Sequence, residues 1–469
     1  MAIATQKGGI AYRSLFDLLL KENSISVVKA RFEKKIPKAK IETAGKHLYK
    51  ILMRSLRMYE AERNLDNRLL GLIAEIQILF NKGLTTLCFS EINRGKKLAI
   101  NSERFLFYLI LARMEQQYLV ALQFPDLDEA TLIGKQAKIK DVLEQESSVH
   151  EHSSLYELIS YRYTYNGVVR SKKDSDKLND LLLEEFQTNR STYFRSYNSD
   201  KLHRHFQAIY FLMSGDATQS LKEFYALNSL LAENKVHFES DPIYYLYLLN
   251  GILTTLRLIK RYDDMNFFIA RLKSFSTSSE STERLRRHFV FFHSTAVLID
   301  NNKYDEAMTV FKESEIVEQQ GAAFRVMSFS LVQIAIISFW TKDYNTSLKY
   351  LNRLHMIPEK YMSPPVYVLG RLLYLLSHLE LHNEDHLSYS VRSIERKLKK
   401  SSRMFNLERL TLAMVNKLIS SAEIMRGPLL KRYIEDVKSL SQSHPYELHL
   451  LALFNFEEWA KSKIQKIKS

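Results

Sequence analysis

Three histidines at intervals of four residues form the clearest group of side chains that could bind a metal. His378, His382 and His386 would share one face of a continuous helix, with glutamates such as Glu380 nearby. The tract Asn383–Asp385, however, is typical of a turn between two helices, and a turn there would move His386 off that face. We therefore expect a solvated helix end at this position and no metal site.

The other patterns that could support catalysis are incomplete. Gln6–Gly9 superficially suggests a phosphate-binding loop, but it lacks the preceding apolar strand and the Gly-Lys-Ser/Thr ending that such loops need. Cys88 lies in a predicted helix with no histidine nearby in sequence to act as a base, so we expect a buried core residue. The sequence thus predicts no catalytic residues, no cofactor and no enzymatic activity.

The composition favours a helical protein with a large core. Hydrophobic residues make up 46% of the 469 residues, and there are only 13 glycines and 8 prolines. Average usage is about 7% glycine and about 5% proline, so turns are few and helices are long. A single cysteine excludes an intramolecular disulfide. We see neither a secretory signal nor an apolar run long enough to span a membrane, and we expect a cytoplasmic protein.

Positive charge is concentrated near the N-terminus. Of a net charge of +14, the first 68 residues contribute 15 lysines and arginines against 7 acidic residues. Such a region could contact nucleic acid or an acidic protein partner. It also has the pattern of an ordinary amphipathic helix over Ser26–Ile36, with Val27, Val28, Ala30 or Phe32 turned inward and a solvated basic face. The candidate basic patch consists of Lys29, Arg31, Lys34, Lys35, Lys38 and Lys40.

Helical periodicity dominates the chain, and no long alternating strand pattern competes with it. In Leu69–Phe80, for example, apolar residues recur every three or four positions, which places them on one helix face. Clusters of Ser, Asp, Gly and Pro predict where helices end or begin. These predicted breaks are Phe124–Asp126, Glu144–Ser154, Ser171–Asp180, Ser274–Thr282, Ser363–Pro365, Gly427–Pro428 and His444–Pro445.

A pattern that repeats about every 40 residues suggests successive pairs of helices. The clearest copies begin at Tyr304 and Tyr344, and weaker copies near Ser214, Tyr262 and His382 continue the series. In a clear copy, an aromatic residue is followed by a small residue that lets two helices approach, and then by a large apolar residue. The two clear copies are Tyr304/Ala307/Phe311 and Tyr344/Ser347/Leu351.

These residues resemble the tetratricopeptide-repeat (TPR) superfamily, although the spacing exceeds the usual period of about 34 residues. The resemblance covers about Lys201–Lys400, and His47–Arg57 with the helix at Ala74–Gly83 is similar to the opening of TPR-like proteins of bacteria. It implies an all-α, TPR-like solenoid of stacked antiparallel helix pairs and brings no activity with it. We expect a basic helical region over 1–122, repeats over 123–400 and capping helices over 401–469.

Binding along a concave surface is the usual role of such a solenoid. The first helices of three pairs supply the candidate groove residues Tyr247, Asn250, Arg257, Phe289, Phe292, Phe329, Ile336 and Trp340. Alternatively, a C-terminal segment or tight superhelical closure covers these aromatic side chains. We expect a non-enzymatic scaffold that binds a peptide or helix of another protein, with a nucleic-acid-associated regulator as the alternative. The sequence leaves the partner, the pathway and the oligomeric state open.

Overall fold

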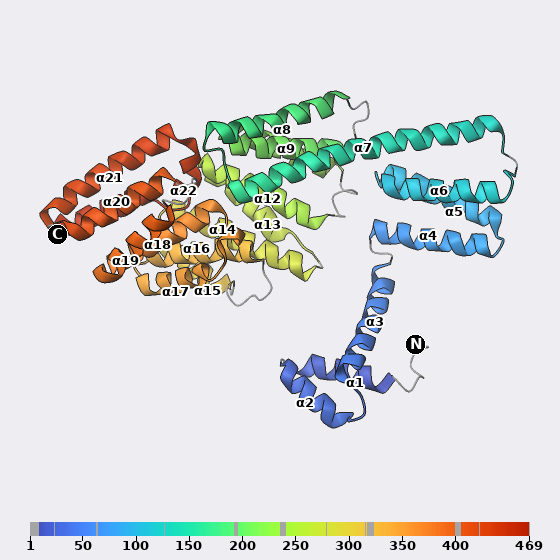
Figure 1. Cartoon of the computed structure of the whole chain (residues 1–469), viewed down its shortest axis with the longest axis horizontal. Coiled ribbons are helices and arrows are strands. Elements are labelled where there is room, and N and C mark those ends of the chain that lie inside the picture. Colours follow the sequence, from blue (N-terminus) through green and yellow to red (C-terminus); the bar gives the residue numbers. More distant parts are fainter. Residues whose placement is uncertain are drawn as a thin grey trace. The chain divides into compact units, whose positions relative to one another are not determined.

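A computed structural model shows an all-helical chain over the residues that it describes (Figure 1). These are residues 9–22, 24–61, 64–125, 127–191, 196–234, 241–277, 279–314, 316, 323–398, 405–421 and 423–468. The chain divides into two compact units, Met1–Leu143 and Glu144–Ser469. The three-part division predicted from the sequence places its first boundary at 122, whereas the compact units meet near residue 143, inside one long helix.

The first unit holds two groups of helices. In the first group, α1 (Gly9–Lys21), α2 (Ile25–Lys35) and α3 (Ile41–Glu60) enclose a small core that includes Leu15 and Phe32. In the second group, α4 (Leu65–Asn81), α5 (Thr85–Asn101) and α6 (Phe105–Ala121) pack in sequence, and α7 (Glu129–Asn166) follows. Glu115 of α6 is buried and accepts hydrogen bonds from Lys96 of α5 and Lys135 of α7, at 2.5 and 2.8 Å. This carboxylate ties three helices together.

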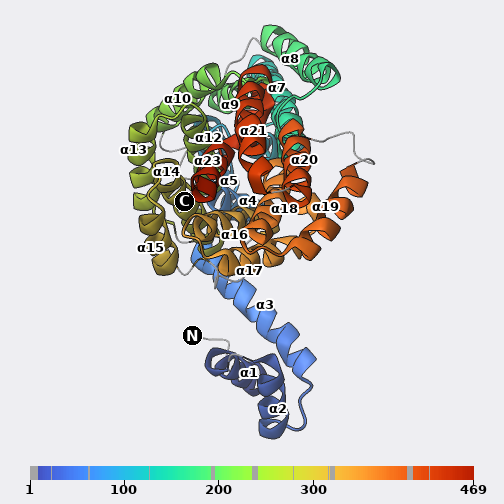
Figure 2. The same cartoon turned by 90° about the vertical axis from the view of Figure 1, so that its left-hand side faces the viewer.

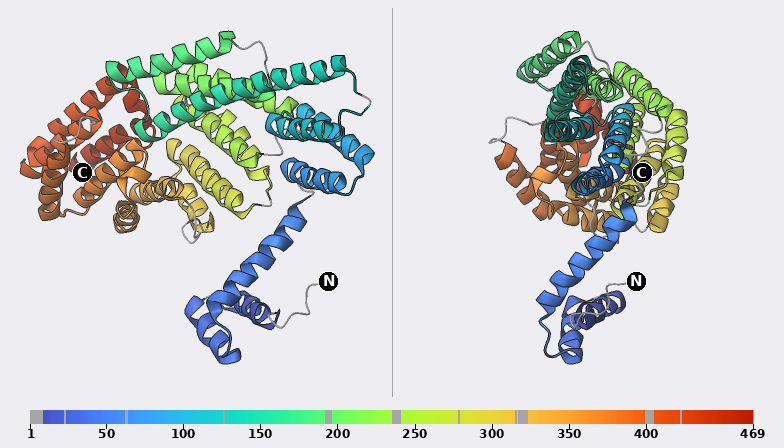
Figure 3. Two further views of the ribbon diagram at one scale, coloured as in Figure 1. Left: turned by 45° about the vertical axis from the view of Figure 1, so that its right-hand side comes forward. Right: turned by 90° about the vertical axis from the view of Figure 1, so that its right-hand side faces the viewer.

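The second unit is a stack of antiparallel helix pairs. After α8 (Lys172–Ser191), the pairs are α9 (Tyr197–Ser214) with α10 (Ala217–Glu233), α12 (Pro242–Leu258) with α13 (Tyr262–Ser274), α14 (Glu280–Asp300) with α15 (Tyr304–Ser314), α16 (Phe324–Trp340) with α17 (Tyr344–His355), and α18 (Pro364–Glu380) with α19 (Glu384–Leu398). Then come α20 (Asn406–Ser420), α21 (Glu423–Ser443), α22 (Leu448–Leu451) and α23 (Phe456–Lys468). The first helices form a curved inner layer, and the second helices lie outside them (Figures 2 and 3).

The same tight turn closes every pair. The residue two positions before the following helix has a positive φ of 51–92°, and the next backbone N–H donates to the carbonyl five residues earlier, at 2.8–3.0 Å. This bond satisfies a carbonyl at the end of the first helix, as in a Schellman motif. The positive-φ residues at these turns are Gly83, Glu103, Gly215, Lys260, Asn302, Lys342 and His382.

The small residue of the predicted repeat is the point of closest contact between paired helices. Ser220 Oγ donates to the Ala208 carbonyl at 2.8 Å, and Ser347 Oγ donates to the Ala335 carbonyl at 2.9 Å, twelve residues back in each case. Ala307 is fully buried at the matching position. The TPR-like helix pairs predicted from the sequence are therefore confirmed.

Two details of the repeat differ from the prediction. The α4–α5 pair has the same contact, since Cys88 Sγ lies 3.7 Å from the Ile76 carbonyl, again twelve residues back. Cys88 is fully buried, as predicted, but its place in a repeat was not recognised because it replaces the expected Ser or Ala. In α18–α19 the inward residue is Leu387, not the neighbouring Ser388.

Two predicted breaks are wrong. Residues Glu144–Ser154 lie inside the continuous helix α7, because this polar tract contains no glycine or proline to interrupt the helix. Gly427–Pro428 lies inside α21. Pro428 is the sixth residue of that helix, so the hydrogen bond that it cannot donate is one to the first turn, at Ile424, and the rest of α21 is not interrupted.

We predict that Gly251→Ala destabilises the second unit. A Cβ atom at this position of α12 would lie 2.6 Å from Phe224 Cζ, a ring that is itself buried in the core. Overpacking of this kind costs about 1–3 kcal/mol, which urea unfolding followed by circular dichroism would detect. Gly427→Ala is the matched control, since its Cβ meets open space and should stabilise the helix by about 0.5–1 kcal/mol. Equal unfolding midpoints for the two variants would contradict the prediction.

Candidate functional site

The inner helices α12, α14 and α16 carry a row of aromatic side chains. Tyr247 meets Phe289 edge to face at 5.7 Å between ring centroids, and Phe292 meets Phe329 in the same way at 5.6 Å. Tyr247 is 47% exposed, while the other three rings are half-buried. Four of the predicted groove residues are thus brought together in two ring pairs, and each keeps part of its surface exposed.

Two other predicted groove residues are not presented to a partner. Ile336 is completely buried in the core. Arg257 is 5% exposed, and its Nε and Nη2 atoms both donate to the Asp300 carboxylate at 2.8 Å. Its guanidinium lies 5.9 Å from the centre of the Phe292 ring. Arg257 therefore links α12 to α14 instead of orienting a ligand.

Asn250 takes part in a series of polar links between neighbouring inner helices. Its Oδ1 lies 2.9 Å from Nε2 of His293, which is fully buried, and burial together with nearby Arg257 lowers the pKa of His293 to about 3. A neutral imidazole is therefore part of the folded structure. Comparable links join the pairs His205–Tyr244 (2.8 Å), His288–Ser330 (2.7 Å) and Thr295–Gln333 (3.1 Å).

The C-terminal segment covers Trp340. The indole is stacked between the Tyr304 ring at 5.0 Å and the Phe454 ring at 5.2 Å. Glu380, at the end of α18, accepts hydrogen bonds from the Trp459 indole and the Lys463 ammonium, both at 3.0 Å. Trp340 is thus covered by the chain itself, whereas Tyr247 of α12 keeps 47% of its surface exposed.

An arginine that the sequence analysis did not select lies near Tyr247. Arg325 of α16 donates from Nη1 to the Thr164 carbonyl at 2.9 Å, and its guanidinium lies 4.9 Å from the centre of the Tyr165 ring. Tyr165 in turn packs on Tyr161 at 4.7 Å. The end of α7 is therefore joined to the inner layer, a contact between residues 161 positions apart that no local pattern could reveal.

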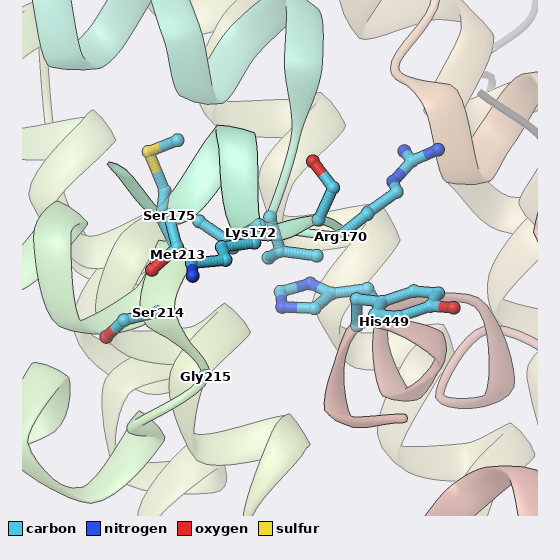
Figure 4. Close-up of a pocket in the computed structure, with 11 residues that line it drawn as sticks. Arg170, Lys172, Ser175, Met213, Ser214, Gly215 and His449 are labelled. Atoms are coloured by element: carbon cyan, nitrogen blue, oxygen red, sulfur yellow. The ribbon is translucent and has the colours of Figure 1, made fainter. Parts of the chain in front are cut away.

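A pocket with a volume of about 380 Å³ lies where α7 and α8 meet in the second unit (Figure 4). Lys172, Ser175 and His449 contribute to its lining. Burial and the nearby Arg170 charge lower the pKa of His449 to about 4. Arg170 itself stacks on Phe405 at 3.9 Å, so it has a structural contact.

The candidate basic patch lies in the first unit, on α2 and the segment that follows it. All six side chains are exposed, and Arg31 forms an ion pair with Glu22. Val28 and Phe32 are buried beneath them, as expected for an amphipathic helix, whereas Val27 and Ala30, also expected to face inward, are exposed. The structure therefore offers a basic surface without distinguishing a solvated face from a binding face.

The histidine group differs from its prediction. A turn does separate α18 from α19, but it places the His386 ring against His378, with 4.3 Å between centroids and 11° between planes. Near-parallel stacking does not point two ring nitrogens at a common ion. Within the described ranges, no three His, Cys, Asp or Glu side chains form a group that could hold a metal.

The fold and the inner face define the class of this protein as a TPR-like, all-α stack of helix pairs. Among solved structures, the chain is similar to a crystal structure of the apo form of RapI, with a TM-score of 0.44 and 12% sequence identity. The match covers 80% of this chain and 98% of that one. No family profile and no curated protein matches the sequence. In the part of the chain that is described, no helix is long and apolar enough to cross a membrane.

We predict that His293 makes stability depend on pH. Because its folded pKa of about 3 lies below the usual 6.5, the unfolded chain binds the proton more readily, and stability is lost as the pH falls from 6.5 toward 3. In His293→Gln, urea unfolding between pH 6.5 and 4 should show a slope smaller by about 1.4 kcal/mol per pH unit. An unaltered slope in His293→Gln would show that His293 is not the source of this pH dependence.

Proposed function

We propose that this protein is a non-enzymatic scaffold that binds a peptide or helix from another protein along its inner face. The observation that supports this most directly is the row Tyr247, Phe289, Phe292 and Phe329, whose rings form two edge-to-face pairs and keep part of their surface exposed. Aromatic side chains of this kind supply large contact areas at little cost in side-chain entropy. The inward curvature of the stack favours an elongated ligand.

The polar links beneath the row support the same role. The Asn250–His293 and Arg257–Asp300 contacts fix the spacing of α12 and α14, so the aromatic rings are held in place before a partner arrives. A preorganised surface loses less entropy on binding than a mobile one. Because Trp340 is covered by Phe454, the proposed contact surface is limited to the four aromatic residues and their neighbours.

A photo-crosslinking amino acid at position 247 tests this proposal. Incorporated in place of Tyr247, it should yield a discrete crosslinked protein in the native host, and Phe292→Ala should reduce that product at least severalfold because it removes an adjoining contact. The matched control is the same amino acid in place of Tyr389, a 71% exposed residue of the outer helix α19. Equal crosslinking from both positions, or none from position 247, would argue against the inner face as the binding surface.

Nucleic-acid binding by the first unit is a second candidate, favoured by the exposure of all six residues of the basic patch. Each phosphate contact contributes a slope of about −0.9 to the dependence of log affinity on log salt for duplex DNA. This candidate predicts that Lys34→Glu with Lys38→Glu reduces the slope by about 2 in titrations of a fluorescent duplex. Nucleic-acid binding by the first unit would be refuted if the double variant left the salt dependence unaltered, or if the wild-type protein bound no duplex at low salt.

A further inference from the structure

Arg325 occupies an unfavourable position for a cation. It is the second residue of α16, where the aligned peptide dipoles place partial positive charge. Nη1 donates to the Thr164 carbonyl, but Nη2 is buried and has no hydrogen-bond partner within the described ranges. A buried N–H of a charged group without an acceptor is costly, and an unfilled acceptor site is a common reason for it.

Three other arginines of the second unit that are buried or half-buried have carboxylate partners. Arg257 is paired with Asp300, Arg286 with Glu283, and Arg371 with Glu408. Arg325 forms no ion pair with any described residue, although it is half-buried. Arg257 Nη1 and Arg371 Nε are also buried without a hydrogen-bond partner, so the missing carboxylate is what sets Arg325 apart. An anion supplied from outside would neutralise Arg325 as the acidic side chains neutralise the other three.

The surroundings of Arg325 are aromatic and accessible. Tyr161, Tyr165 and Tyr247 are 60%, 43% and 47% exposed, respectively, and we call these three residues the tyrosine rim. Burial raises the pKa of the Tyr247 hydroxyl, and the charge of Arg325 opposes this shift, as expected if the two groups are close. Tyr247 also begins the aromatic row through its contact with Phe289. The cation and the apolar surface are therefore continuous.

We propose that Arg325 binds a carboxylate of the peptide that the inner face receives, while Phe289, Phe292 and Phe329 contact its apolar side chains. This inference rests on the proposed scaffold function and specifies the ligand as an acidic peptide. Arg325 and Phe329 are four residues apart on α16, a rise of about 6 Å. An extended peptide advances about 3.3 Å per residue, so the carboxylate and an aromatic or aliphatic residue should be about two positions apart.

Selection from a random dodecamer peptide library on the immobilised full-length chain tests the proposal. Enriched peptides should contain Asp or Glu within one to three residues of an aromatic or aliphatic residue. Replacing that acid by its amide should weaken binding to the wild-type protein about tenfold or more, because a charge-assisted hydrogen bond is lost. This comparison changes only the peptide, so it does not depend on how a protein variant folds.

Protein variants then assign the effect to one residue. Arg325→Gln should abolish the preference for the acid over the amide, whereas Lys222→Gln, an equal change of charge on the outer helix α10, should retain it. Acidic peptides that bind Arg325→Gln as tightly as wild type, or enriched peptides without any acid, would overturn the role of Arg325 but leave the scaffold intact. If no peptide is enriched by the wild-type protein, the peptide-binding function itself is refuted.

Discussion

The second unit depends on the close approach of two helices within each pair. A large side chain at Ser220, Ala307 or Ser347 would separate the paired helices, and the large apolar residues that follow would lose their contacts with the next pair. The two serines also use their hydroxyls to satisfy a carbonyl of the partner helix, which stabilises the contact by about 1 kcal/mol each. A single pair cannot bury both of its faces, so every pair depends on its neighbours.

The inner layer is unusual because its helices are joined by buried polar groups as well as by apolar packing. His293 and Arg257 would be expensive to bury alone, but their partners Asn250 and Asp300 lie on the neighbouring inner helix at hydrogen-bonding distance. Directional contacts of this type fix the register of one helix against the next in a way that interchangeable aliphatic side chains do not. The aromatic row lies on the same helices, so the relative positions of its rings are fixed by the same contacts.

Much of this architecture could be predicted from the sequence, because the repeat is local. Tyr304 and Tyr344 mark the start of equivalent helices, and the small residue three positions later is recognisable in each. Cys88 was harder to interpret, because a cysteine is first considered for its reactivity. In this protein it is the small residue at a contact between two helices. The polar tract at Glu144–Ser154 was misjudged because Ser and His suggest a loop, although neither breaks a helix that has neighbouring helix-forming residues.

The candidate site was predicted in part. Periodicity assigned Tyr247, Phe289, Phe292 and Phe329 to the first helices of recognised pairs, and their use as a binding surface stays a prediction. It could not distinguish the buried Ile336 on the same face, nor foresee that Phe454 would cover Trp340, since more than a hundred residues separate those two. Arg325 and the tyrosine rim depend on a contact between α7 and α16, and helical periodicity contains no information about such pairings.

The contact between Arg325 and Thr164 also bears on the order in which the chain folds. Paired helices meet through residues twelve positions apart, so each pair can form early and independently, whereas closing a loop of 161 residues costs more entropy and comes late. The tyrosine rim is therefore assembled only when α7 meets an already formed α16. An incompletely folded chain would have helix pairs and aromatic residues but no finished rim, so recognition at this surface would distinguish mature molecules from folding intermediates.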